Sequence, residues 1–190
     1  MPFRPSLAVR WLGLSAPAIL APTILLSLAP PPAAAAPKHH APAKEAPSTA
    51  KQLGKFDDWT AVTREEGGQT VCYAFTYPTT SVPKLSGRGK PVLTVTERSS
   101  GRDAVAFSAG FAFAANAETN LQVEQTSLPF YTAGRFAFAR DGAAAVEAFR
   151  KGREATMRSP VPRGAPVSDT FSLNGFSAAY DAITKACPAK

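Results

Sequence analysis

The sequence predicts a mainly β domain, built as an antiparallel β-sandwich or partly closed barrel with two short helices. Short segments such as 69–77 alternate large and small side chains, which is the period of a β-strand. Clusters of turn residues, among them the paired glycines at 67–68, separate these segments. Helical patterns occur in two places, over 143–151 and over 176–187.

The first 52 residues differ in composition from the rest and are expected to lie outside the folded domain. Residues 1–36 have the pattern of a signal peptide, with Arg4 and Arg10 before an uncharged stretch over 11–29 and four alanines at 33–36. Residues 37–52 are typical of a flexible tether rich in proline and alanine. A single β-rich domain then covers 53–190, and we expect a periplasmic or secreted protein. An uncleaved membrane anchor is the alternative, because the uncharged stretch is long enough to span a bilayer.

The strand-like segments of the domain are 56–63, 69–77, 92–97, 104–108, 109–114, 120–125, 133–139, 154–158 and 168–173. Within 69–77 the aromatic side chains share one face and Cys72, Ala74 and Thr76 share the other, so we expect two different neighbours. The segments 109–114 and 133–139 nearly repeat each other, with two phenylalanines on one face and alanines on the other. We expect the phenylalanines to point into the core. A duplicated binding surface is the alternative.

Two helices are expected to interrupt the strands. Asp141 is placed to cap a helix over 143–151, and Gly152 is placed to end it. The second helix follows Asn174 and Gly175. Its apolar stripe consists of Phe176, Ala179, Tyr180, Ile183 and Cys187. This stripe directs the last cysteine toward the sheet.

The two cysteines of the chain are expected to form a disulfide. Export places them in an oxidising compartment, their number is even, and Cys72 lies on the small-residue face of its strand, which a helix can approach closely. A bridge between Cys72 and Cys187 would stabilise the fold by roughly 4 to 5 kcal/mol on the chain-entropy model. A redox-active pair is the alternative, although such cysteines usually occur as C-x-x-C and are exposed.

The sequence favours no catalytic residue, no metal ligand and no cofactor. His39 and His40 are the two histidines of the chain and both lie in the tether, so the domain is expected to lack a histidine base or ligand. Asp57 and Asp58 are adjacent in a predicted strand, so their carboxylates would point to opposite faces. The segment 86–90 is similar to a phosphate-binding loop but lacks the spacing of a P-loop.

Positive charge is concentrated in two stretches of the domain. The chain carries 21 Lys and Arg against 14 Asp and Glu, and residues 84–102 and 150–163 each hold five basic residues against one glutamate. If the fold brings the two stretches together, they form a surface for an anionic lipid head group, a glycan, or an acidic envelope or host protein. The residues we expect to make this contact are Lys84, Arg88, Lys90, Arg153 and Arg158. Solvated charge without a partner is the alternative, and nucleic acid is not expected for an exported protein.

Three parts of the domain together carry a family resemblance. They are Phe56-Asp57-Asp58-Trp59, Cys72 in the following strand, and Ser172-Leu173-Asn174-Gly175-Phe176-Ser177-Ala178-Ala179 near the end. In these segments the chain resembles the invasion-associated locus B family of exported alphaproteobacterial proteins, and the resemblance covers most of residues 54–185. It implies a small, mainly β, exported domain. The chain departs from the family at Thr63, near which members often have a cysteine, and within 126–140, which lacks a later cysteine pair.

We therefore expect a non-enzymatic, exported interaction protein of the envelope, whose basic loops contact an anionic partner. After signal cleavage it would meet a membrane only peripherally, and its oligomeric state is left open. A histidine-free hydrolase is the first alternative, which a buried polar cluster in a deep pocket would favour. A purely structural envelope subunit is the second, which a large exposed apolar patch would favour.

Overall fold

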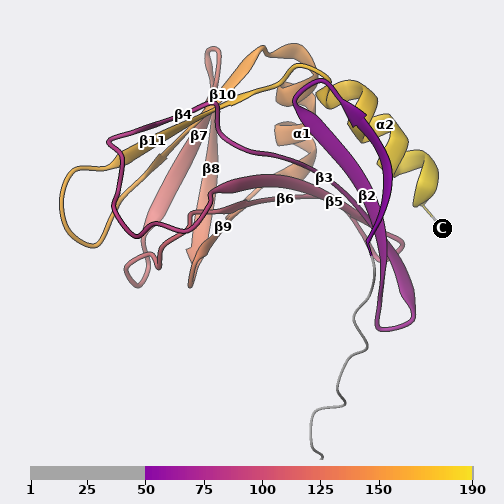
Figure 1. The fold of residues 1–190 in the computed structure, drawn as a ribbon, viewed down its shortest axis with the longest axis horizontal. Helices are drawn as coiled ribbons and strands as arrows, with labels where there is room; N and C mark the ends of the chain where they lie inside the picture. The colour runs from indigo at the N-terminus through magenta and orange to yellow at the C-terminus, as the bar shows by residue number, and fades with distance from the viewer. Residues whose placement is uncertain (1–49, 190) are drawn as a thin grey trace, which may run out of the picture. The chain divides into compact units, whose positions relative to one another are not determined.

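A computed structural model describes residues 50–189, which form a single eleven-stranded sheet and two helices (Figure 1). All strands pair antiparallel, in the order β1-β2-β3-β5-β6-β9-β8-β7-β10-β11-β4. The strands are β1 (Lys51–Phe56), β2 (Trp59–Glu66), β3 (Gln69–Thr76), β4 (Thr80–Val82), β5 (Val92–Arg98), β6 (Gly101–Ser108), β7 (Glu118–Val123), β8 (Thr126–Ala133), β9 (Phe136–Ala139), β10 (Glu154–Ser159) and β11 (Val167–Ser172). The helices are α1 (Gly142–Lys151) and α2 (Phe176–Ala186). The predicted mainly β, antiparallel fold with two helices is confirmed.

The sheet curls until its two halves face each other across the core. Phe107 on β6 packs edge to face against Phe171 on β11, with ring centroids 5.9 Å apart, although four strands lie between β6 and β11 in the sheet order. The edge strands β1 and β4 do not pair with each other, so the sheet of residues 50–189 stays open. A partly closed barrel therefore describes the fold better than a sandwich of two separate sheets.

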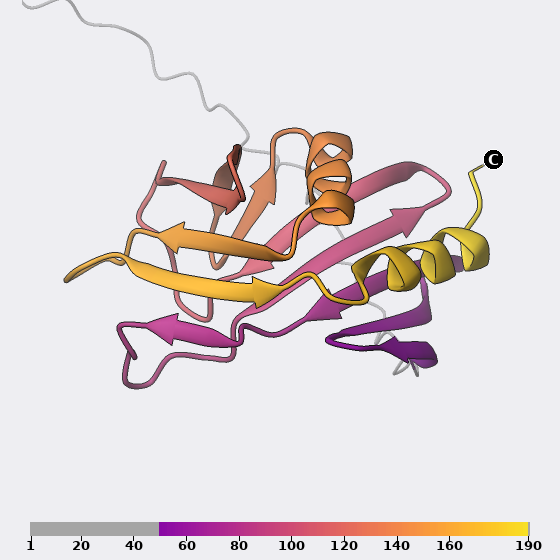
Figure 2. The ribbon, with the colours of Figure 1, turned by 90° about the horizontal axis from the view of Figure 1, so that it is seen from above.

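Both helices lie over the inner face of the sheet, the face that forms the core (Figure 2). α2 packs on β1, β2 and β3, and α1 packs on β6. Phe176, Ala179 and Ile183 of α2 are fully buried, as the apolar stripe predicts. The carboxylate of Asp141 accepts a hydrogen bond from the backbone N–H of Ala144 at 2.9 Å and so caps α1. Neither α1 nor α2 is long and apolar enough to cross a membrane.

Several elements differ from the sequence-based expectation. The chain between Phe56 and Trp59 turns at Asp57, whose φ is 46°, so the expected strand over 56–63 is divided into β1 and β2. β1 begins at Lys51, within the stretch interpreted as tether. β4 and β8 occupy segments where no strand was expected, and residues 109–114 form bends and loop instead of a strand. The predicted signal peptide, and the tether up to residue 49, lie outside the described residues.

The phenylalanines of β9 point away from the core, so the expectation for 133–139 is wrong. Ala137 is fully buried, whereas Phe136 is 48% exposed and Phe138 is half-buried. Phe107 pairs directly with Ala137 on the neighbouring strand and fills the inner face with its own ring. The alanine at position 137 is therefore large enough to complete the packing beside Phe107. In the other repeat, Phe113 is buried, as expected.

The predicted disulfide joins Cys72 on β3 to Cys187 at the end of α2. The two Cα atoms lie 5.9 Å apart and the residues are separated by 115 positions in the sequence. Cys72 and Ala74 are fully buried on the inner face of β3, against which α2 packs. The aromatic residues of the same strand point outward. The two faces of β3 therefore have different neighbours, as the alternation predicts.

Two segments that are distant in the sequence meet where α2 begins. The indole N–H of Trp59 donates to the backbone carbonyl of Ser172 at 3.0 Å, and its ring packs edge to face against Phe176 with centroids 4.9 Å apart. Gly175 has a φ of 83°, and a Cβ there would lie 2.1 Å from the carbonyl oxygen of Phe56. Only glycine fits this position. Two of the three parts that carry the family resemblance, the β1–β2 turn and the start of α2, therefore pack against each other.

Candidate functional site

Arg88, one of the five residues expected to contact an anionic partner, is buried in an ion pair. Its Nη1 and Nη2 donate to the two carboxylate oxygens of Asp169 at 2.8 and 2.6 Å, and its Nε donates to the carbonyl of Ala109 at 2.7 Å. The side chains of Arg88 and Asp169 are only 6% and 0% exposed. Ser81 donates a further hydrogen bond to the same carboxylate. The expectation for Arg88 is therefore wrong, because its charge is neutralised inside the molecule.

The other four predicted contact residues are exposed but do not all lie in one place. Arg153 precedes β10 and Arg158 lies near the end of that strand, so about 16 Å of extended chain separates them. Lys84 follows the edge strand β4, whose last residue, Val82, lies in one row with Ser168 and Arg158. Lys90 stands over the ring of Tyr77, with its Nζ 3.3 Å from the ring centroid. The five residues do not form a single basic surface.

Most of the remaining basic residues in the two stretches are paired with carboxylates. These pairs are Arg98 with Glu66, Arg102 with Glu97, Arg150 with Asp181, and Lys151 with Glu147. Ion pairs at the surface add little to stability. They do lower the net positive charge that either stretch presents to a partner.

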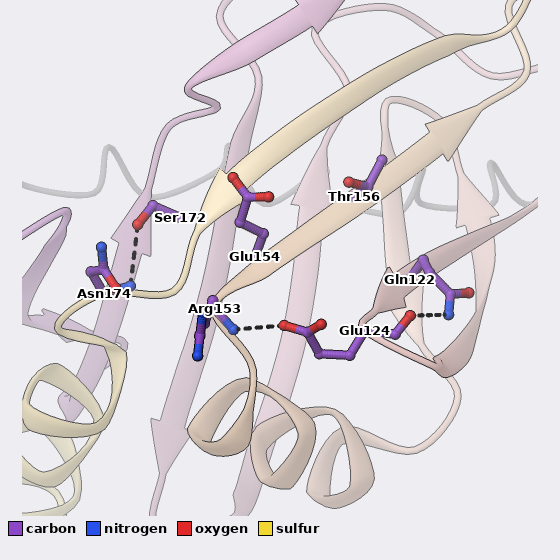
Figure 3. A pocket seen from close by; sticks show the side chains of 7 residues that line it. All are labelled: Gln122, Glu124, Arg153, Glu154, Thr156, Ser172 and Asn174. Atoms are coloured by element: carbon purple, nitrogen blue, oxygen red, sulfur yellow. Dashed lines mark hydrogen bonds between the residues drawn. The ribbon is translucent and has the colours of Figure 1, made fainter.

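A polar groove of about 610 Å³ opens on the outer face of the sheet, where β7, β10 and β11 lie side by side (Figure 3). Seven polar residues line it, and Figure 3 labels all of them. The register pairs Thr156 with Gln122 and Glu154 with Ser172. The backbone N–H of Arg153 donates to a carboxylate oxygen of Glu124, another lining residue, at 3.2 Å.

The polar groove can hydrogen-bond a ligand but does not shield one from water. Its side chains offer hydroxyls, amides, one guanidinium and two carboxylates, and those two, Glu124 and Glu154, are exposed. Among residues 50–189, no three His, Cys, Asp or Glu side chains lie close enough together to hold a metal ion.

An aromatic trough occupies the outer face of β3, β5, β6, β9 and β8, and it includes Phe136 and Phe138 from one of the two repeats for which a binding surface was the alternative. The register aligns Phe75, Thr94, Ala106, Phe138 and Tyr131 in one row across these strands. Side chains directly opposite each other in a ladder point to the same face. The trough consists of a first wall of Tyr73, Phe75 and Tyr77, a floor of Thr94, Thr96, Ala104 and Ala106, and a second wall of Tyr131, Phe136 and Phe138.

The walls of the aromatic trough are exposed and internally packed. Tyr77, Tyr131 and Phe136 are 40%, 45% and 48% exposed. In the second wall, Tyr131 stacks on Phe138 with ring centroids 5.5 Å apart. The alternation in 69–77 and 133–139 is the sequence signal for five of the six rings, and Tyr131 lies outside both segments. This alternation marks two faces of each strand without saying which one meets the solvent.

The aromatic trough has a basic rim. The cations over its rings are Arg64 on Tyr73, Lys90 on Tyr77 and Arg140 on Tyr131. At one end, Arg64 and Arg98 both contact the carboxylate of Glu66, which holds the pKa of Glu66 below its usual value. These three side chains line a depression of about 230 Å³ in the trough.

A buried carboxylate, Glu97, links β5 to the end of α2. The Nε of Arg102 lies 2.6 Å from one carboxylate oxygen of Glu97, and the two form an ion pair whose geometry does not meet that of a hydrogen bond. The backbone N–H of Asp103 donates to the other carboxylate oxygen at 3.1 Å. Burial raises the pKa of Glu97 to about 7. Arg102 also donates to the carbonyl of Cys187, and the Tyr180 hydroxyl donates to the Asp103 carboxylate. Burial, together with that hydrogen bond, raises the pKa of Tyr180 to about 12. This cluster fastens the C-terminal helix to the sheet.

These features define a disulfide-bonded, mainly β domain with two helices on the inner face of one curled sheet. The chain belongs to the invasion associated locus B (IalB) protein family, whose pattern matches residues 59–184. It is similar in fold to invasion associated protein B from Bartonella henselae, known from a crystal structure, with a TM-score of 0.51 and 19% identity. That similarity covers 73% of this chain and 97% of the other. No curated protein matches the chain.

Proposed function

We propose that this chain is an exported protein of the cell envelope that acts by binding an anionic partner, with the aromatic trough and its basic rim as the contact surface. The observation that carries the proposal is the exposure of three large rings, Tyr77, Tyr131 and Phe136, on one face of the sheet. Contiguous aromatic surface in contact with water is typical of places that a partner covers. The cations of the rim favour a partner that carries negative charge.

Three features support export to an oxidising compartment. Residues 1–36 have the pattern of a signal peptide, the domain contains the Cys72–Cys187 disulfide, and the chain belongs to the IalB family. The related protein of Bartonella henselae is described as invasion associated. A role in contact with the envelope or with a host surface, in the periplasm or outside the cell, is therefore part of this proposal.

A histidine-free hydrolase is the second candidate, because two carboxylates, Glu124 and Glu154, share the polar groove. Paired carboxylates perform glycoside hydrolysis when one of them is kept protonated by a shielded environment. Both side chains here are exposed to solvent. The groove therefore favours binding over acid catalysis.

A purely structural envelope subunit would use the same exposed rings for a permanent apolar contact. Such a contact would also bury Lys90, which stands over Tyr77, whereas Arg140 over Tyr131 is already paired with Glu118 at 2.7 Å. Removing a cation from water is costly unless an anion pairs with it. The rim therefore favours an anionic partner over a second apolar surface.

The test is cosedimentation of the purified protein, produced from the full chain, with isolated envelope membranes. Tyr131→Ser combined with Phe136→Ser removes two exposed rings and leaves the core intact. Each ring contributes on the order of 1 kcal/mol, so we expect affinity to fall about tenfold or more. Added salt should weaken binding by screening the rim.

Lys185→Glu is the matched control, because this exposed residue lies on α2 at the opposite face of the sheet. It should sediment like the unmodified protein. Equal sedimentation of the double variant and the unmodified protein would contradict the proposed function.

A further inference from the structure

We infer that the partner of the aromatic trough is an acidic glycan chain that lies lengthwise between the two walls. The inference rests on the proposed function and names the class of its ligand. Three interstrand steps separate β3 from β9, so the backbones under the walls are about 14 Å apart. Lys90 lies two residues before β5 and Arg98 is the last residue of that strand, so at most about 26 Å of extended chain separates them. These dimensions fit an extended polymer chain.

The surface chemistry of the trough matches that of a sugar. A pyranose ring has an apolar face of C–H groups and a polar edge of hydroxyls. The flat rings of the walls can stack on the apolar face. On the floor, Thr94 and Thr96 of β5 lie directly opposite Ala106 and Ala104 of β6, so a row of hydroxyls runs beside a row of methyl groups. The Thr94 hydroxyl donates to the carbonyl of Ala106 at 3.2 Å and can still accept a hydrogen bond.

The charge of the rim indicates an anionic polymer. Arg64 and Arg98 share the single carboxylate of Glu66 and leave one net positive charge at their end of the trough. Lys90 stands at the other end, over the ring of Tyr77. Two positive centres this far apart match repeated carboxylates or phosphates along a chain better than they match one small anion.

Peptide ligands fit the trough poorly. A β-strand ligand binds by adding to an open sheet edge, but β3, β5, β6, β9 and β8 are each paired on both sides. An amphipathic helix binds to an apolar groove, whereas Thr94 and Thr96 place hydroxyls along this floor. A membrane surface would meet the raised rings and leave the depression of about 230 Å³ beside Arg98 unfilled.

The experiment measures binding of three probes by calorimetry: an alginate octasaccharide with one carboxylate per sugar, a neutral dextran oligosaccharide of similar length, and phosphatidylglycerol vesicles. We expect the alginate to bind at least about tenfold more tightly than the dextran, with an affinity that falls as salt rises. Absence of alginate binding at millimolar concentration would overturn the inference.

Ala104→Trp distinguishes the trough floor from the raised rings. Ala104 is exposed on the outer face, so a large side chain fills the trough while both walls and the rim remain. Alginate affinity should fall at least about tenfold, and vesicle binding should stay the same or rise because an aromatic residue is added. Ala104→Leu provides a milder block in case the tryptophan variant folds poorly, and Lys185→Glu is the control. Unchanged alginate affinity in the folded block variants contradicts the inference.

Failure of the inference differs from failure of the proposed function. If the double variant Tyr131→Ser, Phe136→Ser no longer binds the envelope and the unmodified protein does not bind alginate, the aromatic trough remains the contact surface and the glycan assignment is wrong. If the double variant still binds the envelope, the contact surface itself is wrong.

Discussion

Replacing Cys72 and Cys187 together with alanine should lower the free energy of unfolding by about 5 kcal/mol. The bridge joins residues separated by 115 positions. On the chain-entropy model, closing a loop of this length removes about 16 cal/mol/K from the unfolded chain, or about 5 kcal/mol at 25 °C. Domains of ordinary size are stable by only about 5–15 kcal/mol. The protein without its bridge is therefore expected to be close to unfolding at body temperature.

Urea unfolding followed by the fluorescence of Trp59 measures this loss, because its ring is fully buried in the folded domain. The unmodified protein after reduction is the control, since it lacks the cross-link but keeps both sulfur atoms in the core. Reduced protein and double variant should agree within about 1 kcal/mol if the cross-link dominates. A loss below about 1 kcal/mol in both would refute the entropic reasoning, and two free thiols in unreduced protein would refute the bridge.

Three further predictions concern the interior of the domain. Arg88→Ala should cost about 3–5 kcal/mol in urea unfolding, because it leaves the buried carboxylate of Asp169 without its partner; replacing both residues with leucine should recover part of that loss. Gly175→Ala should cost at least about 2 kcal/mol, because the φ of 83° and the nearby carbonyl of Phe56 both exclude a Cβ; an unchanged melting temperature would contradict this. The pKa of Glu97 is raised to about 7 in the folded state, so its contribution to stability is complete below the unfolded value of 4.5 and is lost as pH rises through 7. The melting temperature should therefore fall over that window in the unmodified protein, and less so in Glu97→Gln.

Local patterns predicted the elements that depend on local physics. The spacing of Phe176, Ala179 and Ile183 placed one apolar stripe on a helix, and that stripe alone directed Cys187 toward the sheet. The small-residue face of the strand around Cys72 then provided the surface that a helix can approach. Both inferences needed only the periodicity of the side chains and the oxidising environment that an exported protein meets.

Long-range contacts account for what the sequence did not predict. Arg88 lies in a loop rich in glycine and basic residues, and its partner, Asp169, is 81 positions away in a strand. Charge clustering along the chain is therefore no measure of charge on the surface. The rings of Phe136 and Phe138 face solvent because Phe107, on a different strand, already fills the inner face beside Ala137. Only the order of strands in the sheet shows which face of β9 points into the core and which face is exposed to solvent.

The residues of the family resemblance and those of the aromatic trough serve separate purposes. Trp59 and Gly175 are held by contacts between the β1–β2 turn and the start of α2, so their replacement is expected to destabilise the domain. Tyr131 and Phe136 project from the opposite face and can change at little cost to stability. Proteins that share this fold can therefore keep the same interior while their wall residues, and with them their ligands, diverge. Membership of the family thus indicates the fold of this chain, whereas the partner of the chain has to be identified from the residues on the outer face of the sheet.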